Sequence, residues 1–295
     1  MVTVGSILSG TFRFIGDNVR AILVWSAILL LMSLVMMAMM RPFYEAQIAM
    51  LQQAGGPPAM PQMGSFFLVM LMGLVVFVIL AAAAFRAVLF PEQSRFAYLR
   101  LGMDELRLLG CALVLLIAFY LVMLVVGVVA GVLLGLVAAI LGGSALAAMA
   151  FLPLVMLVPC AWLMTRLALA GPLTIMQRKI VIGPAWRLSR GHFWQLFGAY
   201  LVIMLVLFVV YGGFFLVRMG PTMTDMLHPT DQAAALRVAS AQAAAYTLSL
   251  KNIVMALVTA LIMGFAHALY TGGLAVATAQ LIDRGGGQLL SEVFE

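Results

Sequence analysis

Charged residues are scarce in this chain. They make up 9% of its 295 residues, whereas hydrophobic residues make up 65%. A soluble domain has roughly 25% charged and about 45–50% apolar residues. A soluble fold of this length has too little interior to hide so much apolar surface. We therefore expect lipid to form part of the solvent, which excludes an ordinary soluble domain.

Cysteine and catalytic motifs are also nearly absent. Cys111 and Cys160 lie in apolar runs without metal-ligand spacing, and they are interpreted as small hydrophobic residues. Paired intramembrane carboxylates and the HExxH, GxSxG and GxxxxGK[ST] motifs do not occur. His192, His228 and His267 are far apart and are predicted at different depths. We expect no catalytic residue, no metal and no cofactor, and interpret the protein as not an enzyme.

Long apolar runs are the main feature that is present. A bilayer core of about 30 Å needs about 20 apolar residues in one helix. The runs predict a single, all-α transmembrane domain, 1–295, of a polytopic integral membrane protein. Its six transmembrane helices are expected at about 21–40, 65–90, 109–141, 145–172, 196–217 and 252–282. Pro42 is expected to close the first span, and the sequence LGGS at 141–144 to separate the third from the fourth.

Two longer connections separate spans on the side away from the termini. The segment 42–64 predicts a short helical piece followed by a turn rich in glycine and proline. The segment 219–251 contains an alanine-rich stretch, Asp231–Tyr246, which should be helical by propensity.

Basic residues cluster on one side of the predicted spans. Twelve Lys and Arg fall on the side of both termini, against four on the other, namely Arg41, Arg218, Arg237 and Lys251. The positive-inside rule then places both termini in the cytoplasm of a bacterium, with the spans in the inner membrane. The net charge of +6 reflects this topology and anionic lipid headgroups on the cytoplasmic side, and not nucleic acid.

A weak internal repeat accompanies this topology. The sequence WRLSRGHFWQLFGAYLV at 186–202 aligns without gaps with YLRLGMDELRLLGCALV at 98–114. The segment FRFIGDNVRAIL at 12–23 fits the same frame, and the offsets are 86 and 88 residues. We therefore predict three tandem helix-pair units, at about 1–91, 92–182 and 183–295. Chance alignment of leucine-rich sequences is the alternative.

Each unit begins with a segment that joins aromatic and basic residues. Such segments are typical of interfacial amphipathic helices, and we call them lead-in helices. At 95–109, Arg100, Asp104 and Arg107 would share one face of a helix. In the third lead-in, Arg187, Arg190, His192 and Trp194 are candidate lipid contacts. An ordinary loop whose arginines reach up to phosphates would also explain the charges.

Small residues recur every four positions in two spans. Gly127, Gly131 and Gly135 form one such row, and Gly264 and Gly272 belong to another. These rows predict close helix packing, against a helix of the same chain or of another subunit.

Four further side chains are candidate substrate or lipid contacts. His267 lies near the middle of the sixth span, with Tyr270 one turn later, and an ionisable residue at that depth suggests function. A neutral histidine bonded to a neighbouring helix is the simpler reading. Arg86 and Arg166 lie at matching depths near the cytoplasmic interface. They either reach phosphate or anchor the lead-in helix of the next unit.

The motif WRLSRGHFWQLFG, with SILSGTFRFIGDN and AFRAVLFPE, resembles the YciC-like bacterial membrane proteins. These are similar to the membrane domain attached to some glycerophosphoryl diester phosphodiesterases. The resemblance implies a six-span helical bundle of unsettled function, without phosphodiesterase activity, because the catalytic domain in such fusions is separate.

Two functions remain open from the sequence. The first is a non-enzymatic membrane protein that organises lipids or partner proteins, with a homo-oligomer as one form of partnership. The second is a transporter or lipid-handling carrier, with His267, Tyr270, Arg86 and Arg166 along a polar path. A polar cavity that reaches His267 would favour the second function.

Overall fold

The computed structural model describes residues 2–52, 63–140, 150–227 and 232–284. These residues form helices joined by short turns, without a strand among them, and six helices are long and apolar enough to cross a membrane. The candidate spans are Val19–Gln52, Gly64–Leu89, Arg95–Ile140, Leu152–Gln177, Phe193–Arg218 and Leu250–Asp283. The all-α class and six helices of membrane-spanning length and hydropathy are therefore confirmed. The turn predicted at 141–144 lies outside the described residues.

The helices follow one another in a simple order along the chain. They are α1 (Val4–Asp17), α2 (Val19–Gln52), α3 (Met63–Leu89), η1 (Pro91–Gln93), η2 (Arg95–Tyr98), α4 (Met103–Ile140), α6 (Leu152–Leu167), α7 (Ala170–Gln177), α8 (Gly183–Arg190), α9 (Phe193–Met219), η3 (Gly220–Thr222), α10 (Met223–Leu227), α11 (Gln232–Ala245) and α12 (Leu250–Arg284). Runs of leucine, alanine and methionine favour helix, and in lipid each backbone group must be satisfied within its own helix.

Helix α1 is separated from the first span by a single residue. A capping box joins Thr3 and Ser6 at its start, where the Thr3 hydroxyl accepts from the Ser6 amide at 3.1 Å. At its end Asn18 leaves the helical conformation, and its side-chain amide donates to the Phe14 carbonyl at 3.0 Å. The chain therefore changes direction between α1 and α2.

The first span does not end at Pro42, contrary to the sequence prediction. Helix α2 continues through this proline to Gln52, although proline cannot donate the hydrogen bond expected there. Packing against α11 supplies the reason, because Tyr44 stacks on Tyr246 with ring centroids 5.0 Å apart and Gln232 donates to the Leu51 carbonyl. The helix predicted at Asp231–Tyr246 is confirmed as α11.

The segment 95–109 is not one helix. Phe96, Ala97 and Tyr98 have φ values of 49°, 54° and 63°, which interrupt any helix, and α4 begins only at Met103. The left-handed region is unfavourable for residues that carry a side chain, so neighbouring elements must hold this turn in place.

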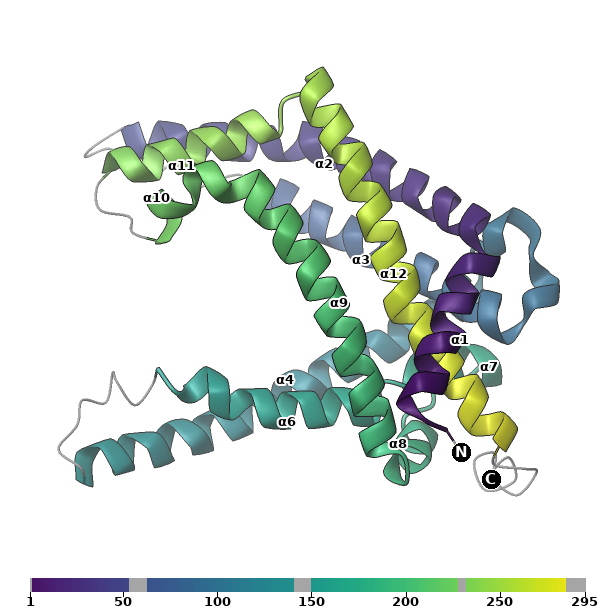
Figure 1. Ribbon diagram of the computed structural model, residues 1–295. Helices are drawn as coiled ribbons and strands as arrows, with labels where there is room; N and C mark the ends of the chain where they lie inside the picture. Colours follow the sequence, from purple (N-terminus) through teal and green to yellow (C-terminus); the bar gives the residue numbers. More distant parts are fainter. Residues whose placement is uncertain (1, 53–62, 141–149, 228–231, 285–295) are drawn as a thin grey trace.

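The six candidate spans pack together at one end. Helix α12 packs chiefly against α2, α3 and α1 and less extensively against α9, whereas α4 packs against α6. These helices meet beside α1, α7 and α8, near the start of α1 and the end of α12 (Figure 1). Buried residues of α3 concentrate between Val78 and Ala87, and those of α12 between Ala266 and Leu281. Leu108 near the start of α4 and Leu196 near the start of α9 are buried with them. We call this region the packed end.

Helices α4 and α6 separate from the other spans at their far end. Helix α4 contacts α6, α7 and α3, and the most hydrophobic stretch of its span contains no buried residue. In Figure 1 the outer part of α4 and α6 projects away from α2, α9 and α12. Apolar side chains such as Leu121 and Val125 are exposed there, as expected for helices that face lipid.

Candidate functional site

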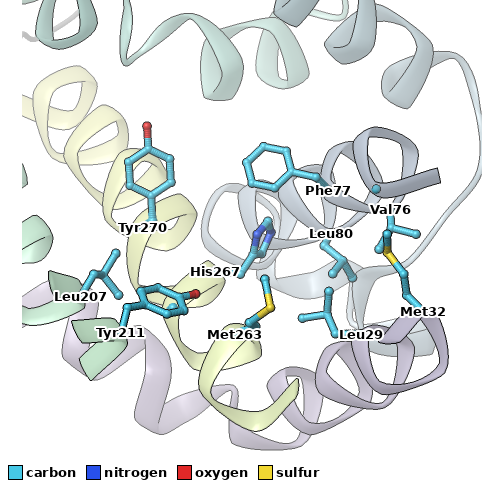
Figure 2. A pocket seen from close by; sticks show the side chains of 12 residues that line it. Leu29, Met32, Val76, Phe77, Leu80, Leu207, Tyr211, Met263, His267 and Tyr270 are labelled. Carbon is cyan, nitrogen blue, oxygen red and sulfur yellow. The ribbon is translucent and has the colours of Figure 1, made fainter. Parts of the chain in front are cut away.

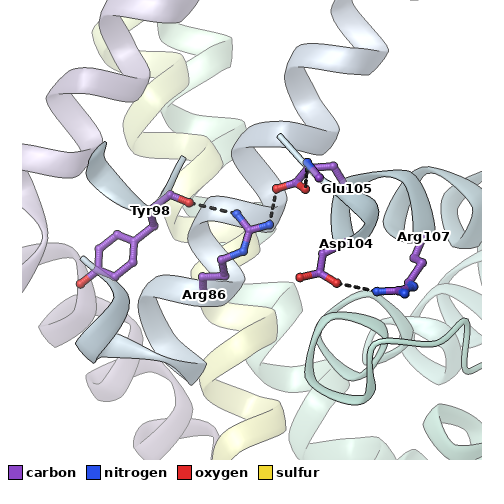
Figure 3. A network of polar contacts seen from close by, with 6 residues as sticks. Arg86, Tyr98, Asp104, Glu105 and Arg107 are labelled. Atoms are coloured by element: carbon purple, nitrogen blue, oxygen red, sulfur yellow. Dashed lines mark hydrogen bonds and ion pairs between the residues drawn. The ribbon is translucent and has the colours of Figure 1, made fainter. Parts of the chain in front are cut away.

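A buried ion pair lies where α3 ends (Figure 3). The Arg86 and Glu105 side chains are paired, and the two residues are only 3% and 7% exposed. Arg86 Nη1 also donates to the Tyr98 carbonyl at 3.0 Å, and the second Glu105 oxygen accepts from the Gly102 amide at 2.9 Å. Both charges are thus hydrogen-bonded as well as paired, as buried charges require.

The left-handed turn at 96–98 is also held by a residue of α2. Trp25 is fully buried, and its indole Nε1 donates to the Ala97 carbonyl at 3.0 Å. The Tyr98 hydroxyl donates to the Pro91 carbonyl at 3.3 Å. Hydrogen bonds from α2 and α3 therefore hold the left-handed turn, and Arg86 anchors the connection from α3 to α4.

Arg166 occupies a different environment at the end of α6. Its guanidinium carbon lies 5.9 Å from the Trp162 ring centroid, 5.7 Å from that of Trp186 and 5.5 Å from that of Phe193. Its Nε and Nη1 are buried without a hydrogen-bond acceptor among the described residues. Aromatic faces attract the cation instead. The Ser189 hydroxyl donates to the Arg166 carbonyl at 3.1 Å, so α8 is also tied to this residue.

Helix α8 has a buried and an exposed face. Ala185, Leu188 and Ser189 are buried, whereas Arg187 and Arg190 are exposed. Beyond it, Trp194 is 75% exposed on the first turn of α9. His192 precedes α9, and its buried Nδ1 has no hydrogen-bond partner among the described residues.

A cavity of about 310 Å³ lies between α2, α3, α9 and α12 (Figure 2). Its walls are mostly aliphatic and aromatic, and its polar side chains are His267, Tyr211 and Tyr270. His267 meets Phe77 edge to face, with ring centroids 5.1 Å apart. A cavity therefore reaches His267, but apolar residues dominate its walls, so it is not the polar cavity that would favour a carrier.

A second cavity, of about 460 Å³, lies between α3, α4, α6, α7 and α12. It shares Phe77 and Tyr270 with the first cavity, and no Lys, Arg, Asp or Glu lines either one. The Arg86 and Arg166 side chains are committed elsewhere, so the structure does not gather them with His267 and Tyr270 into one polar path.

The glycine rows differ in their surroundings. A Cβ atom at Gly264 would collide with Ser26 of α2, and one at Gly272 with Phe14 of α1. By contrast, a Cβ at Gly131 or Gly135 would meet nothing within 4 Å, and one at Gly127 would meet only Met156. Close packing thus involves the α12 row, while the outer part of the α4 row faces open space.

Sequence reasoning missed several residues of these sites. Glu105 was not singled out, although an acid at the start of a span is a candidate partner for a buried arginine. Trp25 and Phe77 look like any other apolar residues of a span. Tyr211 carried a weaker signal, because a tyrosine in the interior of the fifth span has a hydroxyl that needs a hydrogen-bond partner.

Comparison with protein-family models, with curated proteins and with solved structures finds no match for this chain. The geometry of the cavities and of the arginine anchors therefore carries the functional argument.

Proposed function

We propose that this chain is a non-enzymatic, multi-pass protein of the bacterial inner membrane that organises lipids. Acyl chains occupy the two cavities between its helix pairs. The apolar lining of both cavities carries this proposal, because a route for a polar solute would need polar walls whereas an acyl chain needs none.

The exposed cations near the packed end support a second contact with lipid. Arg187, Arg190 and Trp194 would lie at headgroup depth if α8 rests at the membrane surface. Arginine reaches phosphates there, and tryptophan prefers the boundary between headgroups and chains. Anionic headgroups on the cytoplasmic side are the ligands that this face would take, with both chain ends on the same side.

The three-unit design is part of this proposal, and so is the likeness to YciC-like proteins. Arg86 contacts residues 98 and 105, whereas Arg166 contacts residues 186 and 193, and both pairs differ by 88. In the third unit, Gln280 of α12 donates to the Ser6 carbonyl at 2.8 Å. The last span of each unit would thus bind the lead-in segment of another unit, closing a ring.

Purification in native lipid nanodiscs, with mass spectrometry of the retained lipids, tests the lipid-organising function. Ala112→Phe on α4 would fill part of the second cavity, whereas Val125→Phe adds the same ring on the exposed face of the same helix. We expect Ala112→Phe to retain less lipid per protein and Val125→Phe to match wild type. Equal retention by both variants would contradict the proposal.

A lipid-handling carrier is the second candidate function. The shared wall of Phe77 and Tyr270 favours it, since movement of these two rings would join the cavities. The assay is the transfer of a fluorescent phospholipid between the leaflets of proteoliposomes. A rate equal to that of protein-free vesicles counts against a carrier, and an accelerated rate that His267→Ala leaves unchanged removes this residue from its mechanism.

A further inference from the structure

One nitrogen of His267 is a buried polar atom without a protein partner. Its Nε2 makes no hydrogen bond to any described residue. His267 lies at the midpoint of α12, 17 residues from each end, within the sixth candidate span. Leaving such a group unpaired is costly, and lipid chains offer it nothing. We therefore expect an atom of a ligand to form a hydrogen bond with Nε2.

The other nitrogen of the ring indicates whether this ligand atom is a donor or an acceptor. The imidazole lies within hydrogen-bonding reach of the backbone of Leu80 on α3, where the carbonyl is an acceptor. Among the described residues that line the cavity there is no carboxylate to pair with a charged ring, so the apolar surroundings favour the neutral imidazole. A neutral imidazole that donates through one nitrogen presents a lone pair on the other. Nε2 is then an acceptor, and its missing partner is a donor.

The cavity walls restrict the rest of the ligand. Leu29, Met32, Leu207 and Met263 are among the apolar side chains that surround the imidazole. A charged headgroup would find no counter-charge among them and would lose its hydration. In Figure 2 the Tyr211 hydroxyl points toward Met263, on the His267 side, whereas the Tyr270 hydroxyl points away from the imidazole. Among the described residues that line the cavity, Tyr211 is therefore the second polar side chain whose hydroxyl faces the His267 side.

We propose that the cavity around His267 binds an uncharged lipid with a single hydroxyl, which donates its proton to Nε2 while its apolar body fills the space between α2, α3, α9 and α12. This inference rests on the proposed lipid-organising function and names the lipid class. A long-chain alcohol is the simplest such ligand. A phospholipid would contribute only its acyl chains here and would leave Nε2 unpaired.

Photo-crosslinking in nanodiscs tests the inference. The probes are a diazirine-bearing long-chain alcohol and its methyl ether, which has the same apolar body without the donor. We expect the alcohol to label α12 around Met263 about threefold to tenfold more than the ether, the range that one neutral hydrogen bond supplies. His267→Leu should reduce alcohol labelling to the ether's level, whereas His267→Gln, which keeps an acceptor, should retain part of it.

The outcomes separate this inference from the function on which it rests. Equal labelling by alcohol and ether, or unchanged preference in His267→Leu, overturns the hydroxyl contact and leaves lipid binding intact. Absence of labelling by both probes, together with unchanged lipid retention in Ala112→Phe, overturns the lipid-organising function as well. Matching elution and thermal profiles of the His267 variants and wild type ensure that lost labelling is not lost folding.

Discussion

At the scale of single residues, Arg86 has its partners supplied within the next 19 positions of the chain. The buried pair with Glu105 joins the end of α3 to the start of α4. Removing one partner of a buried ion pair leaves the other charge unpaired in an apolar setting, which costs far more than the pair contributes.

We expect Arg86→Ala to lower the free energy of unfolding by about 3–5 kcal/mol. Arg107→Ala is the matched control, because the pair that Arg107 makes with Asp104 at 2.8 Å is partly exposed and should contribute about 1 kcal/mol or less. The measurement is equilibrium unfolding in mixed micelles. The double variant Arg86→Met with Glu105→Leu should lose less than Arg86→Ala, and equal losses for Arg86→Ala and Arg107→Ala would refute the anchor.

Tyr246 gives a pH-dependent prediction outside the spans. Burial, and then the neighbouring Tyr44, raises the pKa of Tyr246 from 10.0 to about 12. The folded state favours the protonated phenol, so this contribution is full below about pH 10 and is lost as pH rises through about 12. The difference in tyrosinate absorbance between wild type and Tyr246→Phe should therefore titrate near pH 12. A midpoint near 10, the ordinary value, would mean that α11 does not pack on α2.

At the scale of elements, α12 is the helix around which the packed end is built. It contacts α1, α2, α3 and α9, and its small residues allow these approaches. A Cβ at Gly273, for instance, would lie 2.8 Å from Cδ1 of Ile203 on α9. Helix α4 has no such central role, because its outer part is exposed.

Gly272→Ala should therefore destabilise the protein by about 1–3 kcal/mol, because the added methyl would force Phe14 to move. Gly131→Ala is the control on α4, where the space is open and alanine favours helix by up to about 1 kcal/mol. Thermal unfolding in one detergent compares the two variants. Equal stability of the two variants would contradict the close packing of α1 on α12.

Most of the elements could be predicted from the sequence, because apolar runs of bilayer length fix where helices must form. The errors occurred where contacts between distant segments prevail over local rules. Stacking on Tyr246 accompanies the continuation of α2 beyond Pro42, and hydrogen bonds from Trp25 and Arg86 hold the turn at 96–98. No local pattern encodes such contacts. His267 was identified from its depth, whereas the apolar walls around it depend on how the helix pairs assemble.

At the scale of the whole molecule, the end that holds the buried core is also the side to which the sequence assigns most of the basic residues. The packed end carries the buried core, both described chain ends and the anchors at Arg86 and Arg166, and it is the side on which the sequence places twelve of the 16 basic residues. The outer ends of α4 and α6 separate from the other spans in Figure 1, whereas α11 packs on α2. This arrangement agrees with the proposed function, in which the protein is anchored at one membrane face and lipid chains enter between its spans.

A dual-reporter fusion tests this account most directly. A reporter that is active only in the cytoplasm and one that is active only outside it are fused in turn to each chain end. The account predicts cytoplasmic activity at both ends, because six crossings return the chain to its starting side. Reporters that place the two ends on different faces, or both outside, would contradict it.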